Sequence, residues 1–217
     1  MARVTPERVA QTRTRLLDAA QQVLIRHGFA GLSTRRVAEA AGMPLSQIQY
    51  HFGSKEGMVL ALFEAMNASL LERQHAMFGN PDLPLSRQWA LACDFLEDDL
   101  ASGYVQVLQE LIAAGWSNPP IREAVSEALD GWQRLLVIVA KRAERRLGDF
   151  GPFVSEDIAA LVGALFLGAE GQILLGRDGP GVPYRQALRR IGDLIARFES
   201  AHIKGDEPCE PATRTPN

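Results

Sequence analysis

Helical periodicity runs through nearly the whole chain and restricts its fold more than any other feature. Between Pro6 and His27, apolar residues recur at spacings of three and four, which places them on one face of a helix. Nearly every other stretch has the same period rather than the alternation typical of a strand. The pattern predicts further helices over residues 34–41, 44–52, 54–78, 85–101, 103–115, 119–147, 155–176 and 183–203. We therefore expect an all-α protein.

Start and stop signals mark the ends of the first helices. Gly28, Gly42 and Gly53 stand where a helix is expected to end. Ser33 and Ser54 stand one residue before a predicted helix, where a hydroxyl can cap free backbone amides. These signals divide the N-terminal part into short helices joined by tight turns.

The helices fall into three predicted parts. Residues 1–56 form an N-terminal domain of three small helices, and residues 57–203 form a larger helical bundle. Residues 204–217 contain three prolines and almost no apolar side chain, which predicts a disordered tail.

Charge is distributed unevenly between these parts. The chain has a formal net charge of -3, but residues 1–57 carry +4 and the remaining residues carry -7. A basic N-terminal part on an acidic remainder indicates a polyanionic partner for the N-terminal part alone.

Cysteine content and hydropathy indicate where the protein resides. Cys93 and Cys209 are the only cysteines, too few for a disulfide framework, which is typical of a reducing cytoplasm. No uninterrupted apolar run reaches the roughly 18 residues needed to span a bilayer. The charged N-terminus lacks the apolar segment of a secretory signal. We expect a cytoplasmic protein with no membrane partner.

The short segment from Pro44 to Phe52 carries the most informative chemistry. At about 100° per residue, Leu45, Ile48 and Phe52 fall in one sector and are expected to face the core. The other positions hold neutral polar or aromatic side chains: Ser46, Gln47, Gln49, Tyr50 and His51. A preceding helix of small residues and a glycine turn complete the plan of a helix-turn-helix.

Such a face suits the major groove of double-stranded DNA. Gln bonds adenine in a bidentate manner, and Ser and Tyr offer hydroxyls to base edges, so neutral polar groups discriminate between sequences. Thr34, Arg35 and Arg36 begin the supporting helix, and Lys55 begins the helix after it. We expect these four residues to hold the phosphate backbone, because free amides and cations suit it. The alternative is an ordinary solvated surface.

The stretch LSTRRVAEAAGMPLSQIQYHFGSKEGMVLALFEAM resembles the DNA-binding motif of the TetR family of bacterial transcriptional repressors. The resemblance covers roughly residues 10–65 and includes Thr34, the Val37-Ala38 pair, Ala41-Gly42 and Ser54-Lys55-Glu56. It implies an Ω-shaped homodimer whose C-terminal domain binds a small ligand and dimerises through its last two long helices. It also implies a location at the bacterial nucleoid.

The chain departs from the family pattern at two positions. The family usually has Ser or Thr where this chain has Pro44, and it favours Tyr where this chain has Gln49. Pro44 still suits the start of a helix, and His51 is our substitute candidate for a phosphate contact. The predicted DNA-binding residues are Thr34, Arg35, Arg36, Pro44, Leu45, Ser46, Gln47, Gln49, Tyr50, His51 and Lys55.

The bundle offers candidates for a ligand pocket and a dimer interface. Large side chains among Leu, Ala and Val suggest a small-molecule effector pocket, although such aromatics are often plain core. Its predicted residues are Leu111, Trp116, Trp132, Leu136, Phe166 and Glu170. The helix predicted at 155–176 is apolar almost all round and has small residues that permit close approach. With the last helix, it supplies the predicted interface of Leu161, Leu165, Gly168, Leu188, Ile191 and Ile195. The alternative for this helix is the core of one subunit.

Several other classes of site find little support. The four histidines lack metal-ligand spacing, so we expect no metal site and no cofactor. Cys93 reads as a core residue, and the acidic run 97–99 reads as a solvated face. We predict a ligand-responsive homodimeric repressor of a near-palindromic operator. A transcriptional activator, a helical-bundle enzyme and a protein-interaction adaptor are the alternatives.

Overall fold

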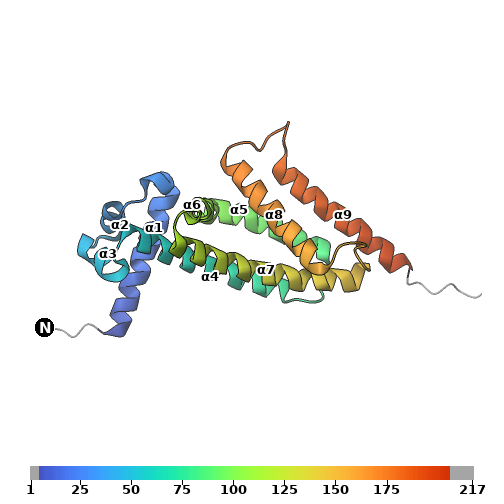
Figure 1. Cartoon of the computed structure of the whole chain (residues 1–217), viewed down its shortest axis with the longest axis horizontal. Helices are drawn as coiled ribbons and strands as arrows, with labels where there is room; N and C mark the ends of the chain where they lie inside the picture. The colour runs from blue at the N-terminus through green and yellow to red at the C-terminus, as the bar shows by residue number, and fades with distance from the viewer. Residues whose placement is uncertain (1–4, 206–217) are drawn as a thin grey trace, which may run out of the picture.

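The computed structural model describes the backbone of residues 5–205 and the side chains of residues 5–201. Within that range the chain forms nine α-helices and no strand, which confirms the predicted all-α class (Figure 1). The helices are α1 (Pro6–Gly31), α2 (Thr34–Ala41), α3 (Leu45–Phe52), α4 (Lys55–Phe78), α5 (Leu85–Ala101), α6 (Tyr104–Gly115), α7 (Pro119–Leu147), α8 (Ser155–Leu174) and α9 (Tyr184–Gly205).

The observed helix ends lie close to the predicted ones, with two informative differences. Helical structure in α1 continues to Gly31, but Gly28 leaves the helical conformation with φ 67° and ψ 178°. The predicted stop at Gly28 is therefore a kink followed by one further turn. At the other end, α9 extends to Gly205, so the first two residues of the predicted tail are helical. The rest of that tail, 206–217, lies outside the described residues.

Local capping builds the turns between α2, α3 and α4. The Ser33 hydroxyl accepts a hydrogen bond from the backbone amide of Arg36, and the Ser54 hydroxyl accepts one from Gly57. Gly42 ends α2 in the left-handed conformation, with φ 63°, which side chains with a Cβ rarely adopt. At Gly57 a Cβ would lie 2.2 Å from the carbonyl oxygen of Phe52, so glycine permits α4 to begin close to α3.

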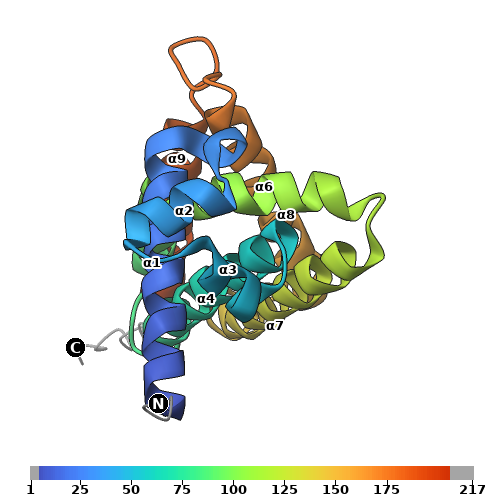
Figure 2. The ribbon, with the colours of Figure 1, turned by 90° about the vertical axis from the view of Figure 1, so that its left-hand side faces the viewer.

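The hydrophobic core is continuous from the N-terminal helices into the bundle. Leu16, Val37 and Ile48 belong to the same cluster of buried residues as Phe63 and Val105. Figures 1 and 2 show α4 leading from the three N-terminal helices into the long body of the molecule, with α6 crossing beside α1. The two parts are therefore packed together rather than joined by a loose linker.

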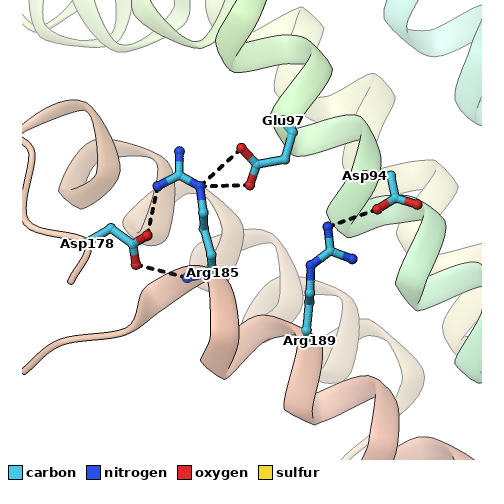
Figure 3. Close-up of polar contacts among 5 residues, drawn as sticks. All are labelled: Asp94, Glu97, Asp178, Arg185 and Arg189. Carbon is cyan, nitrogen blue, oxygen red and sulfur yellow. Dashed lines mark hydrogen bonds and ion pairs between the residues drawn. The ribbon is translucent and has the colours of Figure 1, made fainter. Parts of the chain in front are cut away.

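α8 and α9 run as an oblique antiparallel pair along one side of the bundle (Figure 1). Charged groups fix the start of α9 against α5 (Figure 3). The Arg185 guanidinium donates to Glu97 and Asp178 at 2.8 Å, and Arg189 donates to Asp94 at 2.9 Å. Between these two arginines, the Trp89 indole donates to the Leu188 carbonyl oxygen at 2.7 Å, which adds a third tie between the start of α9 and α5.

α8 is also the one helix in the described range that is long and apolar enough to cross a membrane by length and composition. Its mean hydropathy reaches 1.5 over an 18-residue window, of which 33% is buried. Polar residues interrupt its apolar run, as the sequence indicates. One such helix is weak evidence for a membrane, because a core helix meets the same criterion.

Candidate nucleic-acid interface and ligand cavity

α3 presents a polar face at the end of the molecule that faces the viewer in Figure 2. Ile48 is 1% exposed and anchors the helix in the core, whereas Tyr50 is 72% exposed on the opposite side. Gln49 and Ser46 are exposed, and Gln47 is half-buried. The neutral polar side chains therefore project into solvent, where a partner can reach them.

Leu45 differs from the sequence expectation. We expected it to face the core with Ile48 and Phe52, but its side chain is 51% exposed. Leu45 is the first residue of α3, and helical side chains tilt toward the N-terminus. It therefore extends past the end of the helix rather than over the core, and it lies beside the polar face.

Basic side chains surround α3 without acidic partners. In the range 5–201, the basic members of all ion pairs are Arg73, Lys141, Arg185 and Arg189. None of the pairs involves the basic residues of α1, α2 or the start of α4. Arg35 is exposed. Arg36 donates to the Gly31 carbonyl oxygen at 3.0 Å, and Lys55 lies 5.8 Å from the Phe29 ring centroid. Arg36 and Lys55 are thus positioned by a backbone and a ring contact, neither of which compensates the positive charge.

His51 sits at the edge of the polar face as a neutral group. Burial, and then the nearby guanidinium of Arg13, lower the pKa of its imidazole below the ordinary value of 6.5. The Tyr50 and His51 rings meet edge to face, with centroids 5.0 Å apart. At neutral pH His51 therefore offers an N–H donor rather than a positive charge to a phosphate.

Pro44 precedes α3 and supplies no side-chain cap. Its φ of -60° suits a helix start, and its carbonyl oxygen accepts a hydrogen bond from the amide of Gln47 at 3.0 Å. The helix therefore begins at Leu45 rather than at Pro44, without the hydroxyl that the family pattern usually places there.

The bundle encloses a cavity of about 430 Å³. Its walls are mostly apolar and include aromatic rings from three helices: Trp89 of α5, Trp132 of α7 and Phe166 of α8. The Phe166 ring lies 5.6 Å from Trp89 and 6.4 Å from Trp132, measured between centroids. This volume is within the range of pockets for drug-sized ligands, roughly 300–1,000 Å³.

Two carboxyl groups face this cavity from different helices. Asp99 of α5 is 7% exposed and pairs with Arg73, while Glu170 of α8 is 9% exposed. Burial raises the pKa of Glu170 to about 8, with a further contribution from the charge of Asp99 and an opposing one from a Gln109 hydrogen bond. Burial also raises the pKa of Asp99, against the hydrogen bond from Arg73. The expectation that the run 97–99 is a solvated face is therefore wrong at Asp99.

Four of the six predicted pocket residues line the cavity, and two do not. Trp132, Leu136, Phe166 and Glu170 lie in its wall. Trp116 is 79% exposed, because it follows the last residue of α6 and turns away from the buried face of that helix. Leu111 is buried in the core outside the cavity wall. The structure therefore places Trp116 and Leu111 outside this cavity.

Sequence reasoning missed Trp89, Tyr104 and Gln88 as cavity residues. Tyr104 stacks on Phe63 with ring centroids 5.9 Å apart, and its hydroxyl donates to the Asn67 side chain at 2.9 Å. A signal for the α5 wall was present: Gln88 and Asp99 fall in the same helical register as the apolar stripe of that helix. Polar side chains in a buried stripe indicate a cavity or a buried ion pair.

The outer face of α8 and α9 carries exposed apolar side chains. Leu161 is 55% exposed, Leu165 41% and Leu194 51%, and nothing lies within 4 Å of a Cβ built at Gly168. Leu161 and Leu165 also line the cavity, so they lie where it meets this outer face. Leu188 is different, since it is 3% exposed and packed inside the subunit rather than on the outer face where the prediction placed it. Ile191 and Ile195 are half-buried and line the cavity. The α9 stripe therefore faces its own subunit at Leu188, Ile191 and Ile195.

Comparison with known sequences shows that the N-terminal helices resemble those of a family of bacterial regulators. Residues 16–62 match the sequence pattern of the bacterial regulatory proteins, tetR family. The HTH-type transcriptional regulator CymR of Pseudomonas putida is 30% identical over 132 residues, which are 59% of this chain and 63% of that protein. The chain thus spans less than two thirds of this curated relative.

Comparison with solved structures extends over most of the chain. A transcriptional regulator from Saccharomonospora viridis, crystallised with choline, superposes with a TM-score of 0.70 at 21% identity, covering 87% of this chain and 96% of that one. The multidrug binding protein EbrR, complexed with ethidium, has a TM-score of 0.59 at 26% identity, covering 87% and 98%. The fold of the bundle, as well as that of the N-terminal helices, is therefore shared with such proteins.

Proposed function

We infer, from the premise that this chain belongs to the tetR family of bacterial regulatory proteins, that it is a DNA-binding transcriptional repressor released by a small-molecule effector. Its relatives are transcriptional regulators and not enzymes. The observation that carries the proposal is the exposed polar face of α3, with Gln49 and Tyr50 in solvent and Ile48 in the core. The protein acts in the cytoplasm, on the bacterial nucleoid.

α3 is the recognition helix in this proposal. Its eight residues fit a major groove, and the outward side chains reach base edges or the adjacent backbone: Leu45, Ser46, Gln47, Gln49, Tyr50 and His51. Thr34, Arg35 and Arg36 at the start of α2 and Lys55 at the start of α4 attach the protein to phosphates. Their lack of acidic partners in the described range supports this assignment.

A homodimer would supply two recognition helices for a near-palindromic operator. The exposed side chains of Leu161, Leu165 and Leu194 give α8 and α9 an apolar outer face suited to a second copy. Half-sites one helical turn apart require α3 helices about 34–36 Å apart, or a multiple of that spacing. Paired subunits at any other separation would bind only one half-site.

The cavity is the proposed effector site, and α4 and α6 connect it to the DNA-binding end. Tyr104 lines the cavity, stacks on Phe63 of α4 and bonds to Asn67 of the same helix. An effector that displaces Tyr104 would therefore shift α4, which begins directly after α3. The neighbouring structures with choline and ethidium support a small-molecule site in this type of bundle. The effector must prefer the released conformation by several kcal/mol to free the operator.

Selection of bound sequences from random double-stranded DNA tests the function directly. We expect an enriched site with two related half-sites in inverted orientation. Each subunit is proposed to neutralise three or four phosphates, so the slope of log K against log salt should lie near about -6. A protein that enriches no sequence, or whose weak DNA binding is independent of salt, would contradict the proposal.

Substitutions on α3 separate base reading from phosphate attachment. Gln47→Ala and Tyr50→Ala should relax sequence preference by about 1–3 kcal/mol for each lost base contact, while the salt slope stays the same. Arg35→Gln should weaken binding to all sequences and reduce the slope by about one. A protein-interaction adaptor would show neither pattern.

A further inference from the structure

We propose that the cavity is selective for organic cations with an aromatic or apolar body, and that the carboxyl group of Glu170 meets their positive charge. This inference rests on the proposed effector site and names the chemical class of its ligand. It depends on the position of Glu170 in the cavity wall, on the unsatisfied atoms around it and on the aromatic rings opposite.

Glu170 is placed as a ligand-binding group rather than as a structural one. Its side chain lies in the cavity wall, and its Oε2 atom is fully buried with no hydrogen-bond partner in the described chain. A buried polar atom without a partner costs about 1–3 kcal/mol. A ligand that supplies the missing partner recovers this cost, and a cation recovers the most.

The other unsatisfied atoms of the wall have the same polarity. The Oε1 atoms of Gln74 and Gln88 also line the cavity and lack partners within the described residues. The orientation of the Gln88 amide is fixed, because its nitrogen donates to the Leu83 carbonyl oxygen at 2.9 Å. The two amide oxygens only accept hydrogen bonds, and the Glu170 oxygens do so once that group is ionised, so the three unmatched oxygens favour a ligand that brings donors or positive charge.

Two acidic residues line the described cavity wall, Asp99 and Glu170, and only Glu170 has no positively charged partner. Asp99 of α5 pairs with Arg73 of α4, which thereby compensates it. Tyr104 of α6 contributes a phenol whose pKa is raised by burial, so it stays neutral. Gln109, also on α6, donates its side-chain amide to the Leu167 carbonyl oxygen at 3.2 Å and carries no charge. Among the described lining residues, no Lys, Arg or His is present.

Aromatic rings complete the site. Trp89, Trp132 and Phe166 form one cluster in the wall, and ring faces attract cations at distances up to about 6 Å. Apolar surface accounts for most of the cavity, so a small hydrated ion such as sodium would lose more than it gains there. An aromatic cation is matched by both the rings and the carboxylate.

A proton accompanies the ligand in this arrangement. Because burial raises the pKa of Glu170 to about 8, the empty site holds a neutral carboxylic acid at pH 7. A cation favours the ionised form, so its binding releases close to one proton at that pH. Affinity for a permanent cation should therefore rise by up to about tenfold per pH unit up to about pH 8, and then level off.

The test compares ethidium, a fluorescent permanent cation, with its uncharged parent 3,8-diamino-6-phenylphenanthridine, using nucleic-acid-free full-length protein. The wild type should bind ethidium more tightly at pH 8 than at pH 6. Glu170→Gln should lower the ratio of ethidium affinity to neutral-compound affinity by at least tenfold and abolish its dependence on pH. Glu110→Gln, which removes the same charge from an exposed position on α6, is the matched control and should leave the ratio unchanged.

Measuring proton release tests the proposal on the wild-type protein. This test therefore remains possible if the Glu170→Gln protein fails to fold. Calorimetry in two buffers of different ionisation enthalpy should count close to one proton released per ethidium at pH 7, and none for the neutral compound. Equal affinity for both compounds, an unchanged ratio in Glu170→Gln, or no proton release would each overturn the inference. Binding of the selected operator by Glu170→Gln protein separates the two questions: intact operator binding without cation preference leaves the proposed function standing.

Discussion

The three N-terminal helices and the helices around the cavity differ in how their polar groups are satisfied. In the N-terminal part, Ser33 and Ser54 cap the helices that follow them, and the polar side chains of α3 face water. Around the cavity, Gln74, Gln88 and Glu170 keep buried oxygens without partners. One region therefore has its polar groups matched within the chain or by solvent, and the other leaves them for a ligand.

This difference indicates where each region keeps its specificity. A surface that reads DNA needs a rigid support and side chains that are free to bond, which a short capped helix on a packed core provides. A cavity that responds to an effector needs unmet polar groups, at some cost in stability. The two regions share one core, so a ligand that alters the second can move the first.

Phe63→Ala should have the largest effect on this comparison, because Phe63 packs in the core that joins the two regions. It is 1% exposed, lies on α4 and stacks on Tyr104 of the cavity wall. Removing a buried aromatic ring costs about 3–5 kcal/mol of unfolding free energy. Chemical denaturation followed by circular dichroism should show one transition at a lower midpoint. Trp116→Ala, at a position 79% exposed, should shift it by less than about 0.5 kcal/mol.

Glu170→Gln should give the next largest effect, and its size should depend on pH. The pKa of Glu170 is raised from 4.5 to about 8 in the folded protein, so the folded state holds its proton more tightly than the unfolded state. This contribution to stability is complete below pH 4.5 and is lost as the pH rises through 8. Relative to Glu170→Gln, the wild type should lose about 2 kcal/mol between pH 6 and pH 8.

Denaturation of both proteins at several pH values measures this difference directly. Titrations common to the two chains, such as that of His51, cancel in the comparison. A stability difference that stays constant with pH would show that Glu170 is ionised throughout, as an exposed glutamate is.

The N-terminal region was well predicted because its structure is specified by neighbouring residues. Gly53 followed by Ser54 marks an end and a start, and the hydrogen bond from Gly57 to Ser54 confirms the predicted cap. Ile48 was correctly placed in the core by its position on a helical wheel. The same wheel misplaced Leu45, because a wheel does not include the direction in which side chains tilt at the first turn.

The cavity was less predictable because it depends on contacts between residues far apart in the chain. Asp99 is buried through its pairing with Arg73, 26 positions earlier, which no local pattern indicates. Trp116 was assigned to the pocket by the size of its side chain alone. It follows Gly115, the last residue of α6, so the periodicity of that helix does not predict which way it points. Glu170 was named from the sequence, because it is the one acid in the apolar run 158–174 that follows the first turn of α8.

Ser54→Ala sharpens the comparison with a smaller change. The Ser54 hydroxyl accepts the Gly57 amide hydrogen bond at 3.0 Å and caps α4. Its loss should cost about 1 kcal/mol, a typical value for removing an N-terminal cap. Because α4 begins next to α3, operator affinity should also fall, whereas ethidium affinity should not change. An equal loss of operator affinity and ethidium affinity would show that the cap of α4 stabilises both regions and not the DNA-binding end alone.

Arg189→Gln should have the smallest effect, because its ion pair with Asp94 is exposed to solvent. The two side chains are 50% and 51% exposed, and a single pair of this kind contributes at most about 0.5 kcal/mol. Arg185→Gln removes contacts with both Glu97 and Asp178, so its cost should be larger, about 1 kcal/mol. Denaturation at low and high salt distinguishes the two cases: the Arg189→Gln difference should vanish at high salt. A large, salt-independent loss in Arg189→Gln would instead place Asp94 among the groups that need a partner, as the buried acids of the cavity do.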